Sequence, residues 1–253
     1  MLMHEPQQKS YGKMIMSLHV NSICNLSCKE CIMQPLMQSS IKYHMSIEEL
    51  EELLYFSKLS GYRFDFIVSG GEPLLWENLK DGLKLLKDSD ICKSITMFSN
   101  AMFPEKVTKE IADCLDSIRI SHYFYNEKHM KQLEIMYPDK VRIEERTKFW
   151  EMPKTAVESE IAFPVICLNA GFKFYNKQVY ACVHALSLVE LDPSNAEIPL
   201  GNPLGLDFLE GLAEIKENQK EICRWCISNQ RVRDYVEKVD NISEGKNLVS
   251  III

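Results

Sequence analysis

The sequence lacks the features of a secreted or membrane-bound chain. Its first residues, MLMHEPQQKSYGK, contain neither an apolar signal core nor a small-residue cleavage site. No window approaches the roughly 18 apolar residues that a bilayer span requires. Internal repeats and low-complexity linkers are absent as well. We therefore expect a cytoplasmic protein without a membrane partner, and 253 residues with 46% hydrophobic content predict one main fold.

Positive charge is also in short supply. The chain has 36 acidic and 29 basic residues, a formal net charge of −7, so there is no general electrostatic reason to expect a nucleic-acid partner. The expected partner is a small-molecule substrate, with a peptide as the alternative. Cysteine, in contrast, is abundant, with nine residues. In a reducing compartment, clustered cysteines indicate metal binding or catalysis rather than disulfides.

Short β-rich runs alternate with helical patterns between about residues 15 and 170, which is typical of βα units on a parallel sheet. One helix is predicted to begin at Ser46, where Glu49 completes a capping box and Gly61 follows the end. Another begins at Pro104. Six strands are predicted, at Met16–Val20, Phe64–Ser69, Ser94–Ser99, Ser117–Ser121, Val141–Glu145 and Pro164–Leu168.

The pattern changes after residue 168. Phe172–Tyr175 and Gln178–Cys182 flank Asn176-Lys177, which indicates a β-hairpin. Helical patterns follow at Leu206–Asn218 and Gln230–Val239. We therefore predict a main domain at residues 1–166 and a smaller domain with a C-terminal tail at residues 167–253.

A cysteine motif follows the first predicted strand directly. Cys24, Cys28 and Cys31 form a CxxxCxxC loop at the carboxyl end of that strand. Three thiolates bind three irons of a cubane and leave the fourth iron open to a small ligand. A single zinc ion and unrelated buried cysteines are the alternatives.

A glycine motif ends the second predicted strand, which runs into Ser69-Gly70-Gly71-Glu72-Pro73. Gly70 and Gly71 have no side chains, so their backbone groups can approach a ligand, and Glu72 can support the loop. Parallel α/β barrels assemble their sites at the carboxyl ends of their strands, where both motifs lie.

The ordered pair of CxxxCxxC and GGEP resembles the radical S-adenosylmethionine (SAM) superfamily. The resemblance implies a partial (β/α)6 TIM-like barrel in which Cys24, Cys28 and Cys31 hold a SAM-binding 4Fe-4S cluster. It also implies SAM cleavage to a 5'-deoxyadenosyl radical and a flavodoxin- or ferredoxin-like reductant. One departure is Glu30, which stands where the family usually has an aromatic residue that contacts adenine. The implied cofactor-binding residues are Gly70, Gly71, Glu72, Pro73, Ser99, Asn100, Ser121 and Arg146.

A second set of cysteines, Cys167, Cys182, Cys223 and Cys226, belongs to the C-terminal part. Four thiolates fit either structural zinc or an iron-sulfur cluster. The arrangement resembles the Twitch domain, a short relative of the SPASM domain, and in particular the 2-deoxy-scyllo-inosamine dehydrogenases of butirosin biosynthesis. That resemblance implies an auxiliary 4Fe-4S cluster.

The resemblance favours a dehydrogenase that oxidises an alcohol of a sugar or aminocyclitol to a ketone, with the auxiliary cluster as electron acceptor. A general base is expected near the fourth and fifth strand ends, where His122, Tyr123, Glu144 and Glu145 are candidates. Epimerisation and peptide modification are the enzymatic alternatives, and a zinc-binding adaptor is the non-enzymatic one. Cys92 and Cys114 are predicted to be small buried hydrophobes outside the site, which disfavours a cysteine-dependent epimerase.

Overall fold

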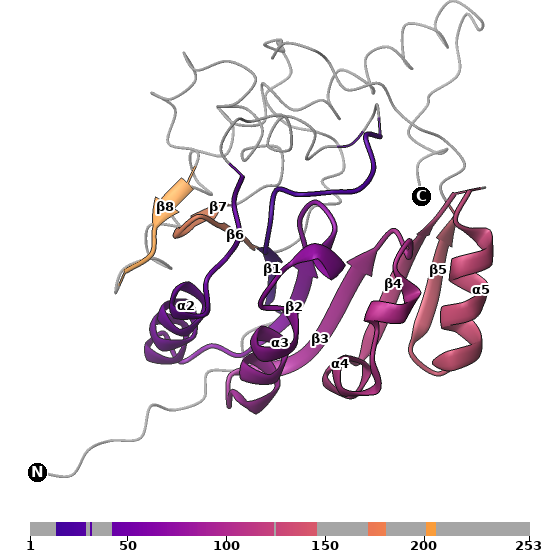
Figure 1. Cartoon of the computed structure of the whole chain (residues 1–253). Helices are drawn as coiled ribbons and strands as arrows, with labels where there is room; N and C mark the ends of the chain where they lie inside the picture. Colours follow the sequence, from indigo (N-terminus) through magenta and orange to yellow (C-terminus); the bar gives the residue numbers. More distant parts are fainter. Residues whose placement is uncertain are drawn as a thin grey trace, which may run out of the picture.

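The computed structural model describes residues 14–28, 31, 42–123, 125–145, 172–180 and 201–205. Within these residues the strands form one sheet in the order β5-β4-β3-β2-β1-β6-β7-β8, and helices line one side of it (Figure 1). The strands are β1 Ile15–His19, β2 Phe64–Ser69, β3 Cys92–Ser99, β4 Ser117–His122, β5 Val141–Glu145, β6 Phe172–Tyr175, β7 Gln178–Tyr180 and β8 Gly201–Pro203. The helices are α2 Ile47–Leu59, α3 Leu79–Asp88, α4 Lys109–Cys114 and α5 Glu127–Met136, with short 3-10 turns η1 Pro73–Leu75 and η2 Pro104–Lys106.

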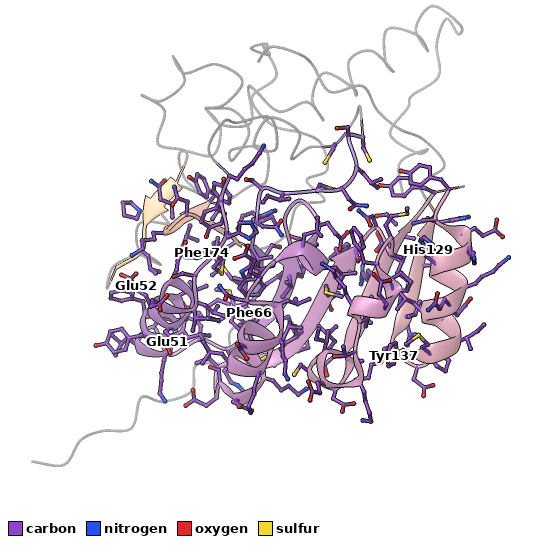
Figure 2. The ribbon with its side chains drawn as sticks, in the orientation of Figure 1. Glu51, Glu52, Phe66, His129, Tyr137 and Phe174 are labelled. Atoms are coloured by element: carbon purple, nitrogen blue, oxygen red, sulfur yellow. The ribbon has the colours of Figure 1, made fainter. Side chains whose placement is uncertain are left out.

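The first five predicted strands are confirmed, each within two residues of its predicted ends, and β1 to β5 pair in parallel. The sixth predicted strand, Pro164–Leu168, lies outside the described residues. Alternation along β2 accounts for the layering, because Phe64, Phe66 and Val68 are fully buried. Phe66 on β2 and Phe174 on β6 both belong to this core (Figure 2). The α/β fold with a parallel sheet is thus as predicted.

Helix α2 begins at the predicted N-cap but does not close the predicted capping box. Ser46 Oγ accepts a hydrogen bond from the Glu49 backbone N–H at 3.1 Å. The Glu49 carboxylate instead accepts from the Tyr43 hydroxyl at 2.6 Å and from the Lys177 backbone N–H at 2.8 Å. The prediction was wrong for this half of the box because Tyr43 and the distant Lys177 donate to the carboxylate instead. Glu49 therefore ties α2 to the β6–β7 hairpin.

The helix predicted to begin at Pro104 is divided into two pieces. Pro104 opens the 3-10 turn η2, and Thr108 then begins α4 by accepting a hydrogen bond from Ile111 N through its side chain. Thr108 is the N-cap of α4, so α4 begins as an element separate from η2. Val107 and Ile111 are buried in the core.

The predicted hairpin is present, with Asn176 and Lys177 at φ 47° and 58° in its turn, but it does not stand apart from the main sheet. Strand β6 pairs in parallel with β1, which places Lys173 opposite Ser17. Strands β6 to β8 therefore extend the barrel sheet on its β1 side. The predicted boundary between residues 166 and 167 lies outside the described residues and stays a prediction.

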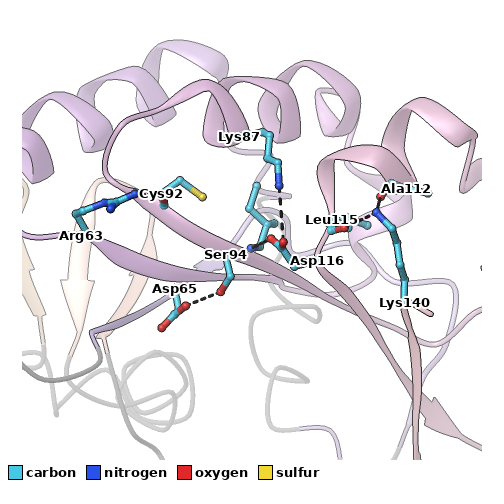
Figure 3. A network of polar contacts seen from close by, with 10 residues as sticks. Arg63, Asp65, Lys87, Cys92, Ser94, Ala112, Leu115, Asp116 and Lys140 are labelled. Carbon is cyan, nitrogen blue, oxygen red and sulfur yellow. Dashed lines mark hydrogen bonds and ion pairs between the residues drawn. The ribbon is translucent and has the colours of Figure 1, made fainter.

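Polar contacts join neighbouring elements near the amino ends of the central strands, at the edge of the sheet opposite the predicted site (Figure 3). Asp65 accepts a hydrogen bond from Ser94, and Lys140 donates to the carbonyl groups of Ala112 and Leu115 at the end of α4. Cys92 is the first residue of β3 at this end, outside the site as predicted, but it is partly rather than fully buried. None of the helices described is long and apolar enough to cross a membrane.

Candidate active site

The cysteine loop and the GGEP loop are joined through their backbones. The Gly71 N–H donates to Asn21 O at 2.9 Å, and the Glu72 N–H donates to Ile23 O at 2.7 Å. Asn21 Nδ2 returns a hydrogen bond to Glu72 O at 2.9 Å. The segment that leads into Cys24 is therefore fixed against the end of β2.

Gly70 and Gly71 are required by this contact. A Cβ on Gly71 would lie 2.1 Å from Ile23 O, and a Cβ on Gly70 would lie 2.5 Å from Asn21 O. Gly70 also has φ +141°, which side chains rarely adopt. The close backbone approach expected at these glycines is thus present, and its partner in the structure is the cysteine loop itself.

Glu72 is a buried connector between the strand ends, with 1% of its surface exposed. Its Oε1 accepts from Ser99 Oγ at 2.8 Å and from Leu74 N at 3.1 Å, and its Oε2 accepts from Asn100 N at 2.8 Å. Burial raises the pKa of Glu72, and these three donors oppose the rise. The predicted support role matches this geometry, and Pro73 follows as the first residue of η1.

The three loop cysteines are partly exposed and form no disulfide. The Cys31 N–H donates to Cys28 O at 3.1 Å, and the Leu26 N–H lies 3.4 Å from Cys24 Sγ. Burial is the main cause that raises the pKa of Cys24 to about 11, with smaller contributions from Glu72 and the other two thiols. Bound iron reverses this penalty by stabilising the thiolate.

Three thiols on one loop provide the donor set that a cubane with one open iron needs, so the residues present fit the SAM-binding cluster. In the described part of the chain, no three His, Cys, Asp or Glu side chains surround a single ion position. The four cysteines of the second set, Cys167, Cys182, Cys223 and Cys226, lie outside the described residues, as does Arg146.

Ser99 and Asn100 lie at this site but are already engaged with protein groups. Ser99 Oγ accepts from Ala101 N at 2.9 Å besides donating to Glu72. Asn100 Nδ2 donates to Asn25 Oδ1 at 2.9 Å and lies 3.7 Å from Cys24 Sγ. Asn100 therefore holds the cysteine loop, whereas Ser99 holds Glu72, and the direct contact of either residue with SAM stays a prediction.

Asn126, which sequence reasoning missed, joins the ends of β3 and β4. It is fully buried, and its Nδ2 donates to Asn100 O and Ser121 O, both at 2.8 Å. Its Oδ1 accepts from Tyr123 N at 2.8 Å. The available signal was its position directly before a helix, where asparagine commonly caps, but here the side chain faces the strand ends instead.

The candidate bases occupy neighbouring positions at the ends of β4 and β5. Strand register pairs Ser121 with Glu144 and His122 with Glu145. The Glu144 carboxylate forms an ion pair with Arg119 at 2.9 Å. The side chain of Glu145 lies outside the described residues, so its chemical role stays a prediction.

Two tyrosines follow β4, and the second of them, Tyr125, reaches the cysteine loop. Tyr123 and Tyr125 stack with ring centroids 5.2 Å apart and an interplanar angle of 5°. The Tyr125 hydroxyl lies 4.0 Å from Cys28 Sγ, and 42% of the residue is exposed. The exposed ring of Tyr125 thus lies beside the cysteine loop. That loop has Glu30 at the position where the sequence comparison above expects an aromatic residue.

Solved structures with the same arrangement of elements include BtrN in complex with AdoMet and 2-DOIA. That structure superposes with a TM-score of 0.60 at 14% identity, covering 83% of this chain and 88% of that one. Selenomethionine BtrN in an open conformation gives a TM-score of 0.54 at 16% identity, covering 86% and 94%. At these identities the likeness establishes the fold, which is the partial barrel expected from the two motifs.

A relative in sequence is the protein named "Probable GTP 3',8-cyclase" of Methanococcus maripaludis strain C5. It is 30% identical over 128 residues, which is 49% of this chain and 42% of the relative. The chain thus matches less than half the length of that protein. The family model for a 4Fe-4S single cluster domain matches residues 12–143, which is just over half of the chain and includes the three loop cysteines. The chain therefore belongs to the 4Fe-4S single cluster domain family.

Proposed function

We propose that the chain is a radical SAM oxidoreductase that converts an alcohol of a small polar substrate, a sugar or an aminocyclitol, to a ketone. The observation that carries the proposal is the fold shared with BtrN over 83% of the chain, because that structure was solved with AdoMet and 2-DOIA. The cysteine loop and the GGEP loop meet at one sheet edge, where such chemistry needs its cofactor.

A reduced cluster with bound SAM supplies a carbon radical strong enough to take hydrogen from an unactivated C–H bond. Cys24, Cys28 and Cys31 would hold three irons. Asn100 and Tyr125 approach two of these sulfurs, at 3.7 Å and 4.0 Å, and these contacts support a role for both residues in adjusting the electron density of the cluster. Tyr125 would also supply the aromatic surface that Glu30 cannot.

Oxidation of the alcohol carbon to a ketone removes two electrons and two protons. One hydrogen atom goes to the radical, one proton goes to a base, and one electron must go to an acceptor. We assign the base to the group His122, Tyr123, Glu144 and Glu145, and the acceptor to an auxiliary 4Fe-4S cluster on the second cysteine set. One SAM would be consumed per ketone formed.

A nucleotide cyclisation is the second candidate function, because the relatives named "Probable GTP 3',8-cyclase" are 30–32% identical over about half of this chain. That reaction has a different substrate and no net oxidation to a ketone. Epimerisation and peptide modification are further radical SAM alternatives. Incubation with SAM, dithionite and either GTP or an inositol, followed by chromatography and mass spectrometry of the products, distinguishes alcohol oxidation from nucleotide cyclisation.

The proposal is tested by the iron and sulfide content of anaerobically reconstituted protein, with EPR of the reduced sample before and after SAM is added. About eight irons, with one SAM-sensitive and one SAM-insensitive signal, are expected for two clusters. Cys28→Ala should remove only the SAM-sensitive signal, and Cys226→Ala only the other. About four irons would remove the electron acceptor and overturn the dehydrogenase, whereas zinc without iron would overturn both cluster assignments. Cys114→Ala is the matched control, since Cys114 lies on α4 outside the site.

A further inference from the structure

The two faces of the sheet differ in chemistry. The face toward the helices is apolar, with residues such as Met16, Leu18, Met97 and Ile120 fully buried. The alternate positions on the same strands form the inner face of the barrel sheet, and most of them are polar. They include Ser17, His19, Asp65, Ser69, Ser94, Thr96, Ser117, Arg119, Ser121, Glu144 and Lys173.

His19 ends β1 on this inner face, level with Ser69 in the register and five residues before Cys24. It is 4% exposed, and its Nε2 is a buried atom with no hydrogen-bond partner in the structure. A buried polar atom without a partner costs stability, so such atoms in active proteins commonly await a ligand or a water molecule. His19 is the last residue of β1, and sites of parallel α/β barrels form at these carboxyl ends of the strands.

The surroundings of His19 define what its Nε2 can bind. Ser69 Oγ donates its single proton to Leu18 O at 3.4 Å, so the contact of 3.5 Å with His19 Nδ1 is best made with the proton on Nδ1. Nε2 then carries the lone pair and is a hydrogen-bond acceptor. Burial, together with the positive charge of Lys173, lowers the pKa of His19 to about 3, so the ring is neutral at physiological pH.

Lys173 places a positive charge near His19. Its Nζ donates to Ser17 Oγ at 3.2 Å on the neighbouring strand, and 6% of the residue is exposed. A substrate ammonium group beside Lys173 would be repelled, whereas a hydroxyl group can donate to Nε2 without an added charge.

We infer that His19 is a substrate-contacting residue, whose Nε2 accepts a hydrogen bond from a hydroxyl group of the substrate on the inner face of the sheet. This inference rests on the proposed function and deepens it by naming a residue that binds a hydroxyl group of the substrate. It also places a substrate contact on β1, away from the base candidates on β4 and β5. The competing explanation is a buried water molecule on Nε2 with no role in binding.

The test is the rate of ketone and 5'-deoxyadenosine formation by the reconstituted holoenzyme over a concentration series of scyllo-inositol, with saturating SAM. His19→Phe removes the acceptor and should lower kcat/KM for scyllo-inositol about tenfold, which corresponds to about 1.4 kcal/mol. His19→Gln keeps a polar group and should recover most of the loss. The KM for SAM should change less than about twofold in both variants. His19→Leu replaces His19→Phe if the larger ring prevents iron loading.

His129 on α5 provides a matched control, because its Nδ1 is also buried without a partner but belongs to a helix rather than to the inner face (Figure 2). His129→Gln should leave kcat/KM unchanged. Equal kcat/KM in wild type and His19→Phe, or an equal loss in His129→Gln, would overturn the contact while leaving the proposed function intact. Absence of ketone from wild type with scyllo-inositol, alongside intact SAM cleavage, would overturn the hydroxyl contact together with the alcohol oxidation.

Discussion

Substitution of Gly71 should displace the cysteine loop and leave the rest of the fold in place. In Gly71→Ala the new Cβ would lie 2.1 Å from Ile23 O and 2.5 Å from Ile23 C, and both are backbone atoms that no rotamer change can move. The loop before Cys24 must therefore shift. The shift breaks two hydrogen bonds, Gly71 N–H to Asn21 O and Glu72 N–H to Ile23 O.

The expected loss of unfolding free energy follows from these contacts. Overpacking of a closely packed position costs about 1–3 kcal/mol. Each lost hydrogen bond adds about 1 kcal/mol. Gly71→Ala should therefore lose about 3–5 kcal/mol of stability. The larger functional effect is on the cluster, because Cys24 moves with the displaced segment.

The assay is urea unfolding under anaerobic conditions, together with iron content and the EPR signal in the presence of SAM. Gly205→Ala is the matched control, because a Cβ there meets nothing within 4 Å, and its stability should change by less than about 0.5 kcal/mol. Gly61→Ala isolates backbone strain, since Gly61 has φ +74° and open space, and should cost about 1 kcal/mol. Stability and iron content of Gly71→Ala equal to those of Gly205→Ala would refute the reasoning.

Three further predictions concern buried polar groups and the cysteines. Asn126→Ala removes three hydrogen bonds at a fully buried position and should lower the free energy of unfolding by about 2–4 kcal/mol in urea. It should also weaken SAM binding in equilibrium dialysis. Unchanged SAM affinity would show that Asn126 does not support the site. Cys92→Ser and Cys114→Ser should keep the iron content of wild type, whereas Cys24→Ser should lose the SAM-sensitive cluster, and iron loss in either of the first two would contradict the ligand assignment. The pKa of His19 is lowered on folding, so the unfolded chain binds the extra proton and stability falls as pH falls below about 6.5. From pH 7.5 to 5.5 this loss is about 1.4 kcal/mol, and it should be absent in His19→Gln measured by the same unfolding assay.

Local patterns in the sequence were sufficient for most of the fold. The β-rich composition of Phe64–Ser69 and Val141–Glu145 predicted those two strands with their observed ends. Burial of one face against helices enforces the period of two, so the signal is contained within each segment. The two motifs were placed correctly for the same reason, since both follow strands that the local pattern defines.

Contacts between distant segments could not be predicted in the same way. The pairing of β6 with β1 joins residues that are about 156 positions apart, and the sequence of neither strand identifies its pairing partner. Asn126 was missed because its three partners belong to the ends of other elements. Tyr125 likewise lies by Cys28 only because the turn after β4 folds back toward the cysteine loop.

The site is a chain of buried polar contacts rather than a set of independent ligands. Glu72 binds Ser99 and Asn100, Asn100 binds the loop of Cys24, and Asn126 binds Asn100 in turn. Each link is satisfied by another protein group, so the loop is held before any cofactor arrives, and preorganisation of this kind lowers the cost of binding. On the same sheet, His19 Nε2 is buried and has no partner. His129 Nδ1 is also unpartnered but belongs to helix α5, whereas His19 Nε2 lies on the inner face at the end of β1, and this position is why we propose that the substrate supplies the missing contact there.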